Sequence, residues 1–453
     1  MEDISDSIGL SEASANLPYF YGIISIMKSF QDKYGKQLIS ELRKFLSSII
    51  IIASSAIIGL VLLLLVNILS TDVISANMCG MMATEGYAWN PTDTWTLLDG
   101  FTDNLMMNIA AFPRQESIVR HTLLAPYADF YGGANMMSHL NDLVNGREIT
   151  PEYTRYYGRY WHGYLIILKP LLSFEIRTLN MFLIILLLFI AERKIIKSYG
   201  MAKGIAFLSV FLIINPLSAM LCMQYASVTY IFLISTLVLL TIREKANGSQ
   251  DLFLLYLIAG ITTSFFDLLT FPLVTLGTLL ITELLTEKNT YIDKLVSRLY
   301  MVARYSAYWC LGYFGLWGSK HLLTGILTDY DIWLDVKAAA FTRIKGGDFD
   351  LSVYNILIQN ARVIVRSPVF VFILVLLLIC IFIALKENHI RNQSGNAILV
   401  SYTVIAIYPI IWYMVLRNHS LTHYNLAFRE LSITVYAIVA CAITLIERRN
   451  RFE

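Results

Sequence analysis

The chain has few charged residues. Asp, Glu, Lys and Arg make up 15% of its 453 residues, whereas soluble domains usually carry about 25%. The net charge is only +2, and no basic block indicates a nucleic-acid partner. The five cysteines are scattered and lack the paired spacing of a zinc site or a disulfide framework. The sequence also lacks a Gly-rich phosphate loop, a serine nucleophile elbow and a dinucleotide-binding fingerprint. These absences exclude the common soluble nucleotide-dependent folds.

Apolar residues are abundant and occur in long segments. Hydrophobic residues make up 57% of the chain, and the mean hydropathy is +0.60. A membrane-spanning helix needs about 20 mostly apolar residues. The first such run starts near Phe45, too far into the chain and too long for a signal peptide, so we expect an uncleaved first span. The sequence therefore predicts an all-α, polytopic membrane protein with about ten transmembrane helices, at residues 45–69, 178–192, 204–223, 225–242, 252–269, 271–285, 299–322, 368–385, 397–416 and 426–446.

The distribution of lysine and arginine predicts the orientation of these spans. Basic residues are concentrated before the first span, after the second and in the C-terminal tail, and such residues mark cytoplasmic segments. Both termini are therefore expected in the cytoplasm. Residues 1–44 form a cytoplasmic amphipathic segment, and residues 45–453 form a single membrane domain. Two long external segments follow, at 70–177 and 319–367, and the first includes an interfacial helix near 164–174.

Acidic residues after the first span are candidates for chemistry. Asp99 and Asp103 are four residues apart, so on a helix their carboxylates would share a face. Such a pair suits a general base, and it also suits a divalent cation. Asp103 is the stronger candidate because apolar residues 105–110 follow it directly, and Glu85 is a further one. Any of these three could instead be a solvated loop acid.

Basic residues cluster at the last external turn. Arg417, His419 and His423 follow a very apolar span, and Arg429 lies further along. Arginine and histidine donate hydrogen bonds to phosphate, so these four side chains could hold a phosphate or pyrophosphate. The two histidines also have the spacing of a helical metal site, but no third ligand is evident. The alternatives are contact with lipid headgroups and an ion pair between Arg429 and Glu430.

An aromatic run and an isolated acid complete the candidates. Residues 155–163 contain Arg155, Arg159, Trp161 and His162, a combination suited to sugar rings and equally to an aromatic belt at the membrane interface. Asp267 lies between two apolar spans, where it either caps the next helix or faces the external cavity.

The stretches 98–108, 156–174, 265–277 and 418–429, in this span order, resemble the GT-C class of integral membrane glycosyltransferases, and more closely its bacterial members. The resemblance covers nearly the whole chain but rests more on layout than on sequence. It implies a sugar donor linked to polyprenyl phosphate and a glycan or lipid acceptor, used at the external face of the bacterial plasma membrane. It also implies an inverting displacement with Asp103, Asp99 or Glu85 as base, and a donor phosphate held by Arg417, His419, His423 and Arg429. No cofactor is implied beyond an optional divalent cation, and membrane lipids are the other expected partners.

One departure from the family concerns the base. Many members place a pair of adjacent acids soon after the first span, whereas Asp72 and Glu85 each stand alone here. Two other functions remain open. A flippase or transporter of a lipid-linked glycan would need charges deep in several spans, and Arg304 is the clear example in this chain. An O-antigen-type polymerase would share the same phosphate site.

Overall fold

The computed structural model describes residues 9–77, 97–132, 135–171, 176–245, 250–287, 294–346, 350–367 and 393–449, with scattered positions between 371 and 382. The chain divides into two compact units, Met1–Ile51 and Ile52–Glu453. Helix α1 (Gly9–Val66) runs through the boundary. Most of the predicted amphipathic segment 1–44 and the first span are therefore parts of one helix, and its segment Leu38–Val66 is long and apolar enough to cross a membrane.

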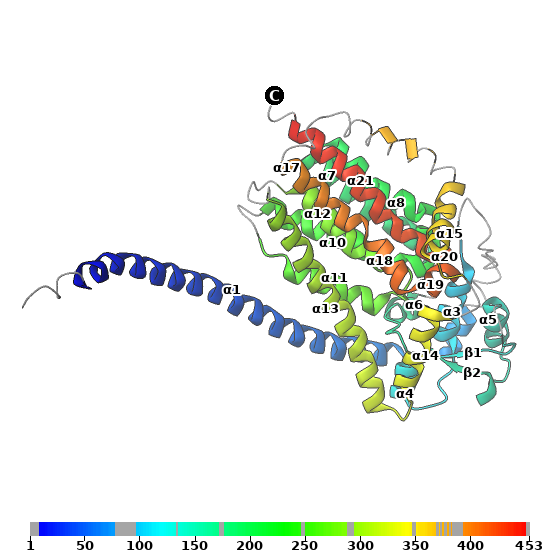
Figure 1. Ribbon diagram of the computed structural model, residues 1–453. Coiled ribbons are helices and arrows are strands. Elements are labelled where there is room, and N and C mark those ends of the chain that lie inside the picture. Colours follow the sequence, from blue (N-terminus) through cyan, green and yellow to red (C-terminus); the bar gives the residue numbers. More distant parts are fainter. Residues whose placement is uncertain are drawn as a thin grey trace, which may run out of the picture. The chain divides into compact units, whose positions relative to one another are not determined.

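The second unit is mainly a bundle of helices (Figure 1). The chain is mostly helical, as the sequence predicts, with little sheet. The bundle helices are α7 (Ile176–Tyr199), α8 (Met201–Ile214), α9 (Pro216–Leu221), α10 (Met223–Lys245), α11 (Phe253–Phe266), α12 (Leu273–Thr286), α13 (Leu295–Leu327), α17 (Gln393–Ala406), α18 (Tyr408–Val415), α19 (Arg417–Thr422), α20 (Tyr424–Ala427), the 3₁₀ turn η4 (Phe428–Glu430) and α21 (Leu431–Arg449).

Membrane-length helices account for part of the predicted spans. Within the described residues, four stretches are long and apolar enough to cross a membrane, and three shorter apolar helices accompany them. The predicted span at 368–385 lies largely outside the described residues. The total of ten spans therefore stays a prediction. The four stretches are Leu38–Val66, Met223–Lys245, Gly395–Val415 and Tyr424–Glu447.

A break divides the predicted span at 204–223. Asn215, between α8 and α9, has a φ of +74°, which ends α8. Its side-chain oxygen accepts from the Ser218 backbone N–H at 3.0 Å and so caps α9, while Pro216 occupies the first turn of α9, where no backbone N–H is needed. The break leaves the carbonyl of Ile214 available to a side chain from elsewhere in the chain.

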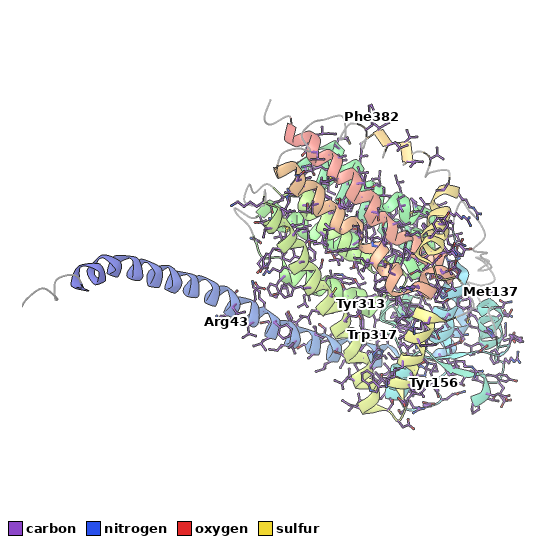
Figure 2. The ribbon with its side chains drawn as sticks, viewed as in Figure 1. Arg43, Met137, Tyr156, Tyr313, Trp317 and Phe382 are labelled. Atoms are coloured by element: carbon purple, nitrogen blue, oxygen red, sulfur yellow. The ribbon has the colours of Figure 1, made fainter. Side chains whose placement is uncertain are left out.

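Two glycines bring α11 and α13 into close contact. A Cβ atom on Gly260 would lie 2.1 Å from the Trp309 carbonyl oxygen, and one on Gly312 would lie 2.2 Å from the Leu257 carbonyl oxygen. Small residues allow this close backbone approach between membrane helices. Tyr313 and Trp317 lie along the same helix α13 (Figure 2).

Short elements gather at one end of the bundle (Figure 1). The first predicted external segment supplies α3 (Gly100–Ala111), α4 (Ile118–Leu124), β1 (Pro126–Ala128), α5 (Met136–Val144), the 3₁₀ turn η1 (Pro151–Tyr153), β2 (Thr154–Tyr156) and α6 (Leu165–Leu171). The second supplies α14 (Ile332–Lys345) and α15 (Val353–Arg366).

A small antiparallel sheet is the exception to the all-α prediction. Pro126 pairs with Tyr156, and Ala128 pairs with Thr154. The buried Asn108 side chain accepts from the Ala128 N–H at 2.9 Å and donates to its carbonyl at 3.0 Å. Asn108 therefore joins α3 to this sheet.

Candidate functional site

Asp103 has a fully buried carboxylate that caps a helix. One of its oxygens accepts from the Met223 N–H at 3.0 Å and the other from the Gln224 N–H at 2.9 Å, at the start of α10. Burial raises the pKa of Asp103 from 3.8 to about 7, although these backbone donors act in the opposite direction. The catalytic role predicted for Asp103 therefore has no support in its geometry.

Asp99 is the second predicted acid that the structure describes. It is the N-cap of α3 and accepts from the Phe101 N–H at 2.9 Å. Burial and the charge of Arg343 lower the pKa of His423, and the negative charge of Asp99 offsets part of this effect. Only the carboxylate of Asp103 contacts the start of α10; Asp99 meets it through its backbone carbonyl, which accepts from the Gln224 side chain at 3.1 Å. The shared face predicted for the two carboxylates stays a prediction. Glu85 lies outside the described residues.

Arg429 is fully buried and held by protein acceptors. Its Nε donates to the Ile214 carbonyl at 3.0 Å, the carbonyl exposed by the break after α8. Nη2 donates to the Ser218 hydroxyl at 2.8 Å, and Nη1 donates to the Asn425 carbonyl. The guanidinium carbon lies 3.8 Å from the centre of the Tyr225 ring. Arg429 thus ties the start of α21 to α8, α9 and α10, a structural role rather than the predicted phosphate contact.

Glu430 does not pair with Arg429, so the predicted ion pair is absent between these two described residues. Its Oε1 accepts instead from the Leu273 N–H at 3.2 Å, at the start of α12.

The other three predicted phosphate ligands lie on or next to α19. Arg417 is exposed, and its Nε donates to the Met414 carbonyl at 3.2 Å. His419 is buried, and its ring lies 4.8 Å from that of His423. Burial lowers the pKa of His419 from 6.5 to about 3, and the charges of His423 and Arg343 lower it further. Both rings are therefore neutral near pH 7 in the absence of a ligand.

Arg343 is a functional candidate that sequence reasoning missed. It lies on α14, which contacts α19, and its Nη2 donates to the Tyr160 hydroxyl at 2.7 Å. Its charge lowers the pKa of both His419 and His423. We call Tyr160, Asp267, Arg343, His419 and His423 the histidine cluster. The only sequence signal for Arg343 was its place in an amphipathic run of the second external segment.

Asp267 joins the histidine cluster through the turn between α11 and α12. Its Oδ1 accepts from the Thr270 hydroxyl at 2.5 Å, and both oxygens accept from the Thr270 N–H. Burial raises the pKa of Asp267 to about 6, while the Thr270 hydrogen bonds lower it. Its charge in turn raises the pKa of Tyr160. Asp267 therefore stabilises the turn that follows α11, whereas the N-cap of α12 is Pro272, so the predicted capping of the next helix is wrong. Its place at an external cavity stays a prediction.

The predicted sugar-binding run is mostly engaged within the protein. Arg155 donates to the carbonyls of Glu152 and Thr154, and Arg159 donates to Asp335 at 2.7 Å. Trp161 is fully buried, and its Nε1 donates to the Leu316 carbonyl at 2.8 Å. These three side chains therefore fix the position of the run, and Arg159 attaches it to α14.

His162 connects this run to the helix bundle. Its Nε2 donates to the Tyr157 carbonyl at 2.7 Å. Burial lowers the pKa of His162 to about 3, so the ring is neutral and Nδ1 accepts from the Tyr164 hydroxyl at 3.1 Å. The Tyr157 ring in turn contacts Tyr160 with a centroid distance of 5.4 Å. A continuous set of contacts thus runs from Tyr164 to the histidine cluster.

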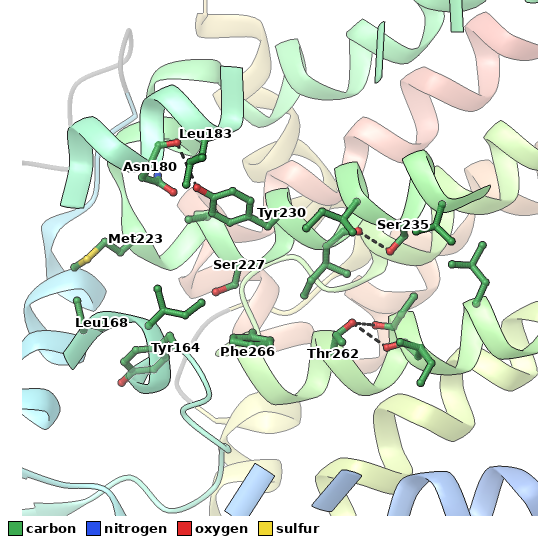
Figure 3. A pocket seen from close by; sticks show the side chains of 18 of the residues that line it. Tyr164, Leu168, Asn180, Leu183, Met223, Ser227, Tyr230, Ser235, Thr262 and Phe266 are labelled. Carbon is green, nitrogen blue, oxygen red and sulfur yellow. Dashed lines mark hydrogen bonds between the residues drawn. The ribbon is translucent and has the colours of Figure 1, made fainter. Parts of the chain in front are cut away.

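Tyr164 also lines a large apolar cavity. The cavity has a volume of about 800 Å³ and lies between α6, α7, α10 and α11 (Figure 3). The Ser235 and Thr262 hydroxyls in its wall donate to carbonyls of their own helices, so they present little polarity to an occupant. Phe266 lines the same cavity and directly precedes Asp267. None of the five described residues of the histidine cluster lines the cavity, so Phe266 is its link to the cluster along the chain.

The combination suits a ligand with an apolar chain and an anionic head. A guanidinium and two imidazoles supply donors for phosphate oxygens. Among the described residues, no group of three or more His, Cys, Asp or Glu side chains could hold a metal ion, so the divalent cation remains an untested expectation.

Comparisons with protein-family models, with curated proteins and with solved structures found no match.

Proposed function

We propose that the chain is a membrane glycosyltransferase that takes a sugar from a polyprenyl-phosphate-linked donor at the external membrane surface. The observation that carries this proposal is the apolar cavity, whose lining includes Phe266, the residue directly before Asp267 of the histidine cluster. Its lining follows α11 from Leu252 to Phe266, a length of about 21 Å at a rise of about 1.5 Å per residue. A long isoprenoid chain fits such a cavity, and its phosphate would lie at Arg343, His419 and His423.

In this proposal Asp99 acts as the base. Both oxygens of Asp103 are engaged at α10, whereas the charge of Asp99 acts on His423. The base removes the proton of the acceptor hydroxyl, and that oxygen forms a bond to the anomeric carbon. The bond between this carbon and the phosphate oxygen breaks, and polyprenyl phosphate leaves. Arg343 stabilises the developing negative charge in a site of low dielectric.

The first test is a thermal-shift titration of the detergent-purified protein with undecaprenyl phosphate and, in parallel, with uncharged undecaprenol. We expect saturable stabilisation by both lipids and a larger effect of the phosphate. Arg343→Gln should remove the difference between the two lipids. Ser227→Trp, which fills the cavity, should remove both effects. The matched control is Arg155→Gln, an exposed arginine outside the cluster, which should behave like wild type.

The absence of any stabilisation would refute the proposal, and so would stabilisation that survives both Arg343→Gln and Ser227→Trp. Transfer is then assayed with polyprenyl-phosphate-linked sugars. Asp99→Asn should abolish transfer and leave the lipid-induced thermal shift intact. Transfer near the wild-type rate would remove Asp99 from the role of base.

A further inference from the structure

Helix α14 has its polar side turned toward the protein and its apolar side turned away. On the protein side, Asp335 accepts from Arg159 and Arg343 donates to Tyr160. The carbonyl of Thr342 accepts from the Asn418 side chain at 2.9 Å. A helix that borders water instead turns its apolar side toward the protein and its polar side toward the solvent.

The outward face of α14 is apolar and uncovered. Leu334, Phe341 and Ile344 are 65%, 63% and 40% exposed, and Trp333 is 50% exposed although one side of its ring contacts His321 of α13 at a centroid distance of 5.9 Å. Ile332 is the one fully buried residue of this helix. Positions 333, 337, 341 and 344 recur at helical spacing and so form one stripe. Because large aromatic and aliphatic side chains rarely form such a contiguous patch in contact with water, the face marks an interaction surface.

The position of α14 in the chain indicates what covers this face. Four residues separate it from the end of α13. The 33 residues of α13 extend about 50 Å, more than the roughly 30 Å of a bilayer core. The end of α13 next to α14 also carries exposed apolar side chains, Leu322 at 57% and Ile326 at 68%. The apolar stripe of α14 thus continues the apolar surface of a helix predicted to span the membrane.

The charged residues of α14 indicate what kind of surface covers its apolar face. Lys337 lies within the stripe and Lys345 at its end, and both are exposed. Basic residues interspersed with Trp and Phe are the composition of helices that lie in the plane of an anionic membrane surface. We propose that α14 is seated in the headgroup region of a bilayer leaflet that contains anionic lipid. Arg343 is then carried into the histidine cluster by a membrane-bound helix. This inference does not depend on the proposed glycosyltransferase activity.

The test measures the depth of α14 in nanodiscs. Phe341 is replaced by the fluorescent amino acid dansylalanine, and Glu148, an exposed residue between α5 and η1, is replaced in the same way as a control. Quenching is measured with doxyl-labelled phosphatidylcholine and with aqueous iodide. We expect lipid quenching at position 341 to exceed that at position 148 several-fold, and iodide quenching to show the opposite order. Iodide quenching at position 341 equal to that at position 148 would overturn the inference. Protection from both quenchers would also overturn it, because a protein partner would then cover the face.

A second experiment tests whether α14 requires anionic lipid. Lipid quenching at position 341 should be stronger in nanodiscs with phosphatidylglycerol than in pure phosphatidylcholine. The double variant Lys337→Gln, Lys345→Gln should lose this difference while eluting as wild type in size-exclusion chromatography. Equal quenching of the protein with both lysines intact in the two lipid compositions would overturn the requirement for anionic lipid.

Discussion

Replacing Arg429 with lysine separates a structural role from a ligand-binding role. Lysine keeps the charge but has one nitrogen in place of the three that donate to Ile214, Ser218 and Asn425. At least two of these acceptors then lose their donor, at roughly 1–3 kcal/mol each. The stacking of the guanidinium over Tyr225 is lost as well, a further 1–2 kcal/mol approximately. We expect Arg429→Lys to lower the free energy of unfolding by roughly 5 kcal/mol, near the middle of the range of about 3–8 kcal/mol that these contributions give.

The assay is thermal melting of the purified protein before any lipid is added. Arg429→Lys should melt several degrees below wild type, whereas Arg417→Lys, at an exposed position, should melt with wild type. A direct phosphate contact predicts the opposite pattern for Arg429→Lys, with an unchanged melting temperature and a lost response to undecaprenyl phosphate. That pattern would refute the structural role argued here.

Three further predictions address pH, packing and topology. The pKa of Asp103 is raised from 3.8 to about 7 in the folded state, so between these pH values the folded state retains a proton that the unfolded state releases. The free energy of unfolding therefore falls as pH rises, by up to about 1.4 kcal/mol per pH unit. Asp103→Asn should remove that dependence, and parallel melting-temperature curves for both proteins between pH 4 and pH 7 would contradict it. Gly312→Ala should lower the free energy of unfolding by about 1–3 kcal/mol, because its Cβ would meet the α11 backbone. The control Gly318→Ala, on the same helix, meets nothing within 4 Å and should leave stability unchanged. Equal melting temperatures of the two variants would count against the close contact. A reporter at Asn141 should read external and one after Glu453 cytoplasmic, and the reverse result would invert the predicted orientation.

The helical class of the fold followed from composition, but helix lengths and the small sheet did not. Apolar content predicts helices in a membrane protein because no other open structure satisfies the backbone there. The break at Asn215 was missed although the pair Asn215-Pro216 is a turn signal. The surrounding apolar run was long enough to be taken for one span. The pairing of Pro126 with Tyr156 joins residues 30 positions apart in sequence, and it depends on the Asn108 side chain from α3.

The sequence predicted several residues of the candidate site, but for most of them it did not predict the role that the structure shows. His419, His423 and Asp267 are brought to one cluster, whereas the external position expected for them stays a prediction. The sequence alone does not distinguish Arg429 from an arginine that binds phosphate. Its burial is explained by the Ile214 carbonyl, which the break after α8 leaves without a backbone partner among the described residues and which accepts from Arg429. Arg343 was missed because the contact between α14 and α19 joins segments about 75 residues apart, and no local pattern encodes such a contact.

The glycine contact between α11 and α13 also has a consequence for biogenesis. Helix α11 has 14 residues, about 21 Å, which is shorter than a bilayer core of roughly 30 Å. A segment of this length is poorly held by lipid alone, and its tightest neighbour, α13, is synthesised later. We therefore expect α11 to be stably inserted in the bilayer only after Gly312 of α13 has been synthesised.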